Sequence, residues 1–189
     1  MLVLASKSPY RRKLLQQLGL RFHCAAPAVD ETVRAGESAD RLVVRLAVEK
    51  ARAGAAEWPG AVVIGADQVA ECGGEIFGKP GTAEAAVNML RRSSGMEVKL
   101  YTGLALIGTS GCEQTKIEIF HAKFRPLDEA TIQRYVAREK PLDCAGAVRA
   151  EGPGIALLEH LRGDDPNTLI GLPLIALVRM LEAEGVRVV

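Results

Sequence analysis

Aromatic side chains are scarce in this sequence, at 4% of its 189 residues, and neither sign of charge is in excess. Lysine and arginine number 24 against 23 aspartates and glutamates, which gives a formal net charge of +1. A near-neutral chain argues against a broad nucleic-acid-binding surface, but it allows a local pocket for an anion. The length and the 48% of hydrophobic residues indicate a globular protein with one large domain or two closely joined lobes.

Long apolar runs and closely spaced cysteines are also missing. No stretch approaches the roughly 20 apolar residues of a membrane span, and the apolar residues 1–4 are too few for a signal peptide. Cys24, Cys72, Cys112 and Cys144 are too far apart in sequence for a zinc-knuckle spacing. We therefore expect a cytoplasmic protein in which these thiols are buried and unpaired.

Short apolar runs alternate with helix starts, and the pattern changes to a hairpin in the second half. Strands are predicted at residues 2–5, 21–26, 61–66, 97–107, 112–124 and 155–160, with a hairpin turn at Gly73-Gly74. Helices are predicted over 9–18, 39–56, 83–92, 128–138 and 173–184. This order predicts an α/β fold with a mixed sheet.

Two cations occupy unfavourable positions in the first predicted helix. Arg11 and Arg12 follow the expected cap Ser8, so they face the positive end of the helix dipole at a cost of up to about 1 kcal/mol each. Arg11 also lies on the leucine-bearing face of the helix, where a buried guanidinium needs a partner. With free helix N–H groups and the hydroxyls of Ser6 and Ser8, the two arginines would form an anion site. The alternative is that Arg11 pairs with an internal carboxylate and Arg12 is solvated.

Further charges stand next to predicted buried elements. Lys50 extends the apolar stripe of the second helix, and from spacing alone it either snorkels to solvent or reaches a phosphate. Asp67 directly follows the apolar strand 61–66, where ligands gather in α/β sheets. It could hold a metal ion, accept a proton from water or cap a loop. The loop dipeptide Asp30-Glu31 is either solvated or a source of a second carboxylate.

One apparent nucleotide-binding motif is rejected. Residues 73–79 fit the G-x-x-x-x-G-K part of a P-loop, but Pro80 follows in place of the serine or threonine that binds magnesium. Proline also removes a backbone donor. Lys79 therefore remains only a candidate phosphate contact. The three histidines, His23, His121 and His160, are isolated in sequence and are expected to be structural or surface residues.

Seven short motifs follow one another along nearly the whole chain. They are Ser6-x-Ser8-Pro9-x-Arg11-Arg12, Asp30-Glu31, Leu46-Ala47-x-Glu49-Lys50-Ala51, Gly65-Ala66-Asp67-Gln68-Val69, Gly78-Lys79-Pro80, Tyr101-Thr102-Gly103 and Gly171-Leu172-Pro173. Through them the chain resembles the Maf family of nucleoside triphosphate pyrophosphatases. The resemblance implies cleavage between the α and β phosphates, a divalent metal cation (Mg, Mn or Co) and a homodimer. It also implies one Maf/ITPase-like α/β domain over residues 1–189, with a mixed twisted sheet flanked by helices and two lobes around a central cleft that holds the active site.

The same resemblance suggests roles for individual residues. Asp67 corresponds to the proton acceptor that activates water, and Glu31 to a carboxylate that handles the metal, with Asp67 as its second ligand. The remaining matched polar residues correspond to a cradle for the triphosphate. They are Ser6, Ser8, Arg11, Arg12, Lys50 and Lys79. In this interpretation the substrate phosphates are the missing partners of Arg11 and Lys50.

One region departs from the commonest pattern of the family. In residues 143–152, Cys144 replaces a lysine and Glu151 replaces a glutamine, and residues 165–171 also differ. These changes are similar to those of the subfamily that hydrolyses 7-methyl-GTP. Tyr10 and Gln68 are further candidates for reading the base.

The chemistry of the base favours the same substrate. The carboxylate of Glu151 can accept both donors on one edge of guanine. Methylated guanine is cationic, and stacking on Tyr10 would add roughly 0.5–2 kcal/mol of cation–π attraction. The alternative functions are a pyrophosphatase for dTTP, UTP and CTP, and a nucleotide-sensing inhibitor of cell division.

Overall fold

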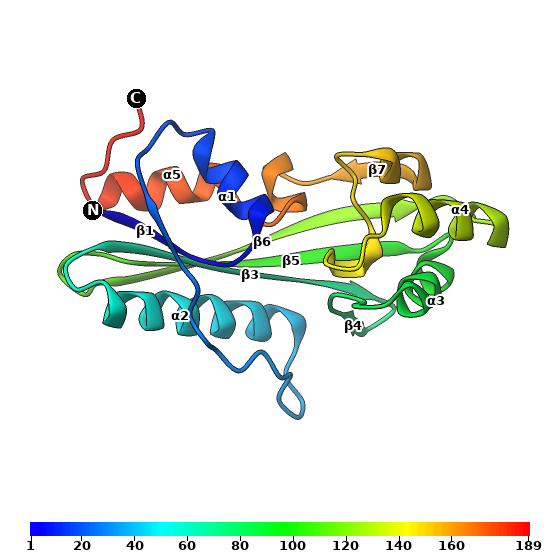
Figure 1. The fold of residues 1–189 in the computed structure, drawn as a ribbon, viewed down its shortest axis with the longest axis horizontal. Helices are drawn as coiled ribbons and strands as arrows, with labels where there is room; N and C mark the ends of the chain where they lie inside the picture. Colours follow the sequence, from blue (N-terminus) through cyan, green and yellow to red (C-terminus); the bar gives the residue numbers. More distant parts are fainter. The chain divides into compact units, whose positions relative to one another are not determined.

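The computed structural model describes residues 1–189, which form five α-helices and a mixed sheet in the strand order β2-β1-β3-β5-β6-β7, with β4 paired to β3 (Figure 1). The strands are β1 (Leu2–Ala5), β2 (His23–Ala25), β3 (Val62–Cys72), β4 (Glu75–Phe77), β5 (Glu97–Ile107), β6 (Glu113–Phe124) and β7 (Leu158–Arg162). The helices are α1 (Pro9–Gln16), α2 (Ala39–Glu57), α3 (Ala83–Ser93), α4 (Glu129–Glu139) and α5 (Leu174–Ala183). The predicted mixed α/β fold is confirmed.

The chain divides into two compact units, and β3, β5 and β6 contribute residues to both. Unit 1 consists of residues 1–67, 102–118 and 171–189, and unit 2 of residues 68–101 and 119–170. A central cleft between two lobes, with the active site inside it, stays a prediction. None of the helices combines the length and the apolar character that crossing a membrane requires.

Unit 1 is built around β1, all four residues of which are buried. This strand pairs in parallel with β2, where Val3 is opposite His23, and with β3, where Ala5 is opposite Gly65. Within this unit α2 covers one face of the strands, and α1 and α5 cover the other (Figure 1). A strand enclosed on both faces and both edges reads as a continuous apolar run, as the sequence of β1 does.

Two glycines let α2 lie unusually close to the strands of unit 1. A Cβ atom at Gly65 would lie 2.1 Å from the carbonyl oxygen of Ala47, and one at Gly103 would lie 2.2 Å from that of Val43. Both carbonyls belong to α2, so β3 and β5 each contact the helix backbone directly. The position of Lys50, one turn after Ala47, follows from this close packing.

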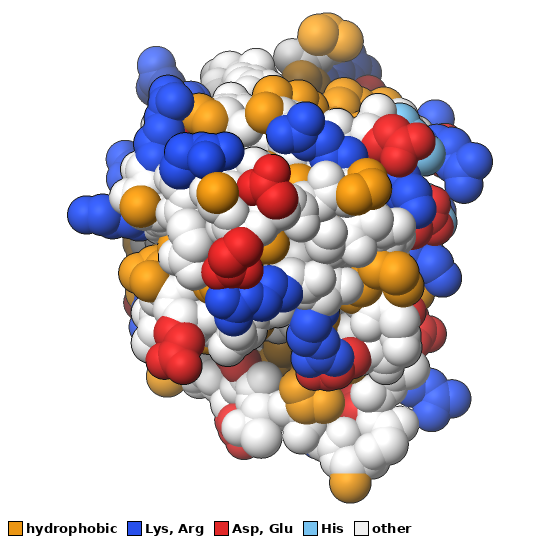
Figure 2. All heavy atoms as spheres, turned by 90° about the vertical axis from the view of Figure 1, so that its right-hand side faces the viewer, with side chains coloured by type: hydrophobic (Ala, Val, Ile, Leu, Met, Phe, Trp, Pro, Cys, Tyr) orange, Lys and Arg blue, Asp and Glu red, His pale blue; other side chains and the backbone are white.

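Unit 2 has its own apolar core under α3 and α4. Buried residues that include Phe77, Leu90, Phe124 and Ile132 pack together there. The predicted hairpin at Gly73-Gly74 is confirmed, since β3 and β4 pair antiparallel on either side of it. Figure 2 looks onto the face that carries α3 and α4 and shows acidic and basic side chains interspersed on it.

Several predicted boundaries are wrong. The strand expected to end at residue 66 continues to Cys72, because its second half gains a hairpin partner in β4. The strand expected over 155–160 begins only at Leu158, since residues 153–157 form a 3₁₀ helix that starts at Pro153. The cysteines are unpaired, but only Cys72 is buried.

The close approach at Gly65 gives a stability prediction. Gly65→Ala should lower the free energy of unfolding by about 2 kcal/mol or more, because α2 must move to admit the methyl group. Gly78→Ala is the control, since a Cβ atom there meets nothing within 4 Å, and it should change stability by less than about 1 kcal/mol. Urea unfolding measures both variants, and equal effects would contradict the close-packing argument.

Candidate active site

The turn between β1 and α1 is shaped by two serine hydroxyls. Ser8 caps α1, where its hydroxyl accepts a hydrogen bond from the backbone N–H of Arg11 at 3.3 Å. The hydroxyl of the buried Ser6 accepts one from the N–H of Ser8 at 3.2 Å. Pro9 holds the first helical position, where its missing N–H costs nothing. The predicted helix start is confirmed, and it carries no acidic residue in its first turn.

Arg11 lies at the centre of this turn and is half-buried, as its position on the leucine face predicts. Its Nε donates to the carbonyl oxygen of Gly171 at 2.8 Å, and its Nη1 lies 3.5 Å from the Ser6 hydroxyl. Burial lowers the pKa of Arg11, while the charges of Asp67 and Glu31 oppose that shift. Arg11 therefore has a backbone partner, and two carboxylates lie near enough to act on its charge.

Lys50 joins the two candidate catalytic carboxylates. Its Nζ lies 2.6 Å from Oδ1 of Asp67 and 2.6 Å from Oε1 of Glu31. The side chains of Lys50 and Asp67 are about nine-tenths buried, whereas that of Glu31 is 58% exposed. Lys50 thus does not snorkel and has two carboxylate partners, and its contact with a substrate phosphate stays a prediction. Asp67 lies within β3 rather than after it.

The donor set suits a divalent cation. No group of three or more histidine, cysteine, aspartate or glutamate side chains is arranged to hold a metal ion. Oxygen atoms of Glu31 and Asp67 nevertheless converge on one positive charge, the ammonium group of Lys50. Mg²⁺ is commonly bound by one or two carboxylates together with substrate phosphates. Glu31 and Asp67 are therefore the residues that would hold the metal, which would supply positive charge to the phosphates.

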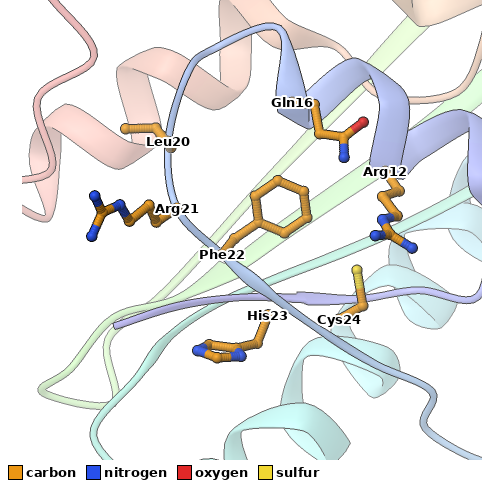
Figure 3. A pocket seen from close by; sticks show the side chains of 7 residues that line it. All are labelled: Arg12, Gln16, Leu20, Arg21, Phe22, His23 and Cys24. Atoms are coloured by element: carbon orange, nitrogen blue, oxygen red, sulfur yellow. The ribbon is translucent and has the colours of Figure 1, made fainter.

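The side chain of Arg12 points away from the contacts that Arg11 makes. Its side chain lines a pocket of about 470 Å³ with Gln16, Leu20, Arg21, Phe22, His23 and Cys24 (Figure 3). In Figure 3 its guanidinium extends past α1 toward Cys24 on β2. The structure therefore does not place Arg12 with the contacts of Arg11 and Ser6, and its part in binding phosphate stays a prediction.

The other predicted site residues are spread over both units. Tyr10 is half-buried in the first turn of α1, in unit 1. Gln68 belongs to unit 2, where its Nε2 donates to the carbonyl oxygen of Thr168 at 2.7 Å. Lys79, between β4 and α3, and Glu151, before the 3₁₀ helix at Pro153, are exposed residues of unit 2. Their roles in binding phosphate and base stay predictions.

Two contacts of this site were not predicted. The carbonyl of Gly171 accepts a hydrogen bond from Arg11. The resemblance to the Maf family includes the motif Gly171-Leu172-Pro173 but suggests no role for it. Arg45 forms ion pairs with Glu37 and with Glu49, the residue four positions later on α2. Only the spacing of Arg45 and Glu49 could have indicated this pairing beforehand.

Together these features define a class of protein. It is an α/β protein in which a capped helix start with a half-buried arginine adjoins two carboxylates and a lysine, an arrangement suited to phosphate groups and a metal. The family model for Maf-like proteins matches residues 1–184. The chain therefore belongs to the Maf family. A curated relative from Nitrosococcus oceani, named 7-methyl-GTP pyrophosphatase, is 53% identical over 185 residues, covering 97% of this chain and 93% of the relative.

Solved structures give more distant matches. The Ham1 protein of Staphylococcus aureus is 17% identical and has a TM-score of 0.47, with 65% of this chain and 71% of that chain covered. A nucleoside-triphosphatase of Mycobacterium abscessus, described as a dITP/XTP pyrophosphatase, is 16% identical with a TM-score of 0.42, covering 67% of this chain and 75% of that one.

The pairing of Lys50 gives the second prediction. Lys50→Met should destabilise the protein by about 3 kcal/mol at pH 7, because it leaves the buried Asp67 carboxylate without its cation. The double variant Lys50→Met/Asp67→Asn should recover part of that loss. Lys116→Met, which removes an exposed lysine 3.7 Å from Glu118, is the control and should have little effect. Urea unfolding at pH 7 is the measurement, and a wild-type midpoint for Lys50→Met would contradict the pairing.

Proposed function

We propose that this protein is a nucleoside triphosphate pyrophosphatase that hydrolyses 7-methyl-GTP to 7-methyl-GMP and diphosphate, removing modified nucleotides. The observation that carries the proposal is the 53% identity, over 97% of this chain, to a relative that bears the name 7-methyl-GTP pyrophosphatase. The grouping of Arg11, Lys50, Glu31 and Asp67 within unit 1 supports it, since triphosphate hydrolysis needs cations for the phosphates and a base for water.

The reaction follows from these groups. A water oxygen forms a bond to the α-phosphorus while the bond from that phosphorus to the bridging oxygen of the β-phosphate breaks. Asp67 accepts the proton of the attacking water, and diphosphate leaves with the bonding electron pair. Arg11 and the positive end of the α1 dipole offset the negative charge that builds up on the phosphates.

The divalent metal, the homodimer and the cytoplasmic location belong to the same proposal. Glu31 and Asp67 would hold the metal when it is bound, and it would add positive charge next to the phosphates. Homodimer formation rests on membership of the Maf family. The cytoplasmic location rests on the unpaired cysteines, which suit a reducing compartment.

Asp67→Asn tests the chemistry. We expect its kcat to fall by about 10²- to 10⁴-fold, because the amide cannot accept the proton, while nucleotide binding survives. Diphosphate release is measured for wild type and variant with 7-methyl-GTP, GTP, dTTP, UTP and CTP. Asp164→Asn, at an exposed position, is the control. Full activity of Asp67→Asn would mean that another group, such as Glu31, is the base, and faster wild-type turnover of UTP than of 7-methyl-GTP would overturn the proposed substrate.

Glu151→Gln tests the reading of the base. Its kcat/KM for 7-methyl-GTP should fall by about 10-fold or more, while that for UTP changes little, because an amide cannot accept both guanine donors. Glu159→Gln, another exposed residue of unit 2, serves as the matched control. An unchanged order of substrates would remove Glu151 from base recognition.

A further inference from the structure

Burial does not explain why the side chain of Glu31 stays at the candidate site. It lies in the segment between β2 and α2, which contains no helix or strand, and its side chain is 58% exposed. Its carboxylate nevertheless lies 2.6 Å from the buried ammonium of Lys50. An exposed side chain on an irregular segment is mobile unless its backbone is fastened.

Arg45 of α2 provides that fastening. Its Nη2 donates to the carbonyl oxygen of Thr32 at 3.1 Å, one residue from Glu31. Its Nε and Nη2 also donate to the two carboxylate oxygens of Glu37, at 2.6 and 2.8 Å. One guanidinium therefore binds the segment at two places five residues apart and ties both to α2. A guanidinium can make both contacts because it is planar and carries several N–H donors.

The Arg45–Glu37 pair is well shielded from solvent. The two side chains are 13% and 9% exposed, whereas in the pair between Arg52, also on α2, and Glu113 of β6 the exposures are 66% and 30%. Arg45 lowers the pKa of Glu37 to about 2. Exposed pairs contribute little, but a shielded bidentate pair fixes geometry.

Hydrogen bonds within the segment, one of them to Glu37, also hold its conformation. Oε2 of Glu37 accepts a hydrogen bond from the backbone N–H of Arg34 at 3.0 Å, and Asp30 accepts one from the N–H of Thr32 at 3.0 Å. Glu49 of α2 adds contacts to Arg34 at 3.1 Å and to Arg45 at 3.3 Å. In these contacts the cations Arg34 and Arg45 face the anions Glu37 and Glu49.

We propose that Arg45 is a positioning residue that fastens segment 30–37 to α2 and thereby holds Glu31 against Lys50 and Asp67. The catalytic consequence rests on the proposed function. Arg45 acts through the backbone next to Glu31 and touches neither the phosphates nor the attacking water. Loss of a residue that orients a metal-handling carboxylate typically costs about 10- to 100-fold in activity.

The kinetic test compares Arg45→Ala with Arg45→Lys and with the control Arg52→Ala, using 7-methyl-GTP and Mg²⁺. Arg45→Ala should lower kcat about 10- to 100-fold with a smaller change in KM. Arg45→Lys keeps the charge but loses the fork, so its kcat should stay at least about 5-fold below wild type. Arg52→Ala should match wild type. Wild-type kcat in Arg45→Lys or in Arg45→Ala would overturn the proposal.

A double-variant cycle separates positioning from general damage to the fold. If Arg45 acts through Glu31, Arg45→Ala should reduce kcat by less than about 3-fold once Glu31→Gln is already present. The same 10- to 100-fold loss in that background would mean that Arg45 acts independently of Glu31, which would overturn the proposal.

Amide hydrogen exchange tests the positioning without any assay of activity. In Arg45→Ala the N–H groups of Thr32, Arg34 and Glu37 should exchange about 10-fold faster or more, while those of α2 and β3 keep their wild-type rates. Arg52→Ala should leave all of them unchanged. Unchanged exchange in segment 30–37 would overturn the proposal. If the wild-type protein hydrolyses no nucleotide, the proposed function fails, and the exchange rates alone decide whether Arg45 holds the segment.

Discussion

The ammonium group of Lys50 is the contact on which the candidate site depends. It is buried, and its two carboxylate partners come from different parts of the chain, Glu31 from an irregular segment and Asp67 from β3. A buried charge is tolerated only when it is paired. Burial of this cation accounts for its pairing with the equally buried Asp67, and Glu31, 36 positions earlier in the sequence, converges on the same point.

The packing of α2 sets where that ammonium group lies. Gly65 and Gly103 allow the helix backbone to contact β3 and β5 directly, and at these two positions there is no room for a side chain between α2 and the strands. Lys50 is one turn beyond Ala47, and Arg45 is on the preceding turn. The same helix thus presents one cation to the candidate catalytic carboxylates and another to the segment that carries Glu31. A change in the helix position would alter both contacts together.

Much of the fold was predictable because the signals are local. The expected cap Ser8 accepts a hydrogen bond from the backbone N–H of Arg11, and the bounds predicted for β5 match the structure. The errors lie at the ends of elements. Residues 67–72 continue β3 because β4 folds back onto them across the turn at Gly73-Gly74, although the apolar run itself ends at Ala66. At β7 the first residues expected in the strand form a 3₁₀ helix that starts at Pro153.

The sequence by itself determined the family, the type of fold and the chemical character of the site, because motifs, caps and helical stripes depend on residues a few positions apart. Only the tertiary structure decided which groups meet. Arg11 donates to the carbonyl of Gly171, 160 residues later, and Lys50 pairs with the carboxylates of Glu31 and Asp67. These pairings follow from the burial of charge between segments distant in sequence, and local patterns carry no information about which distant group will satisfy it.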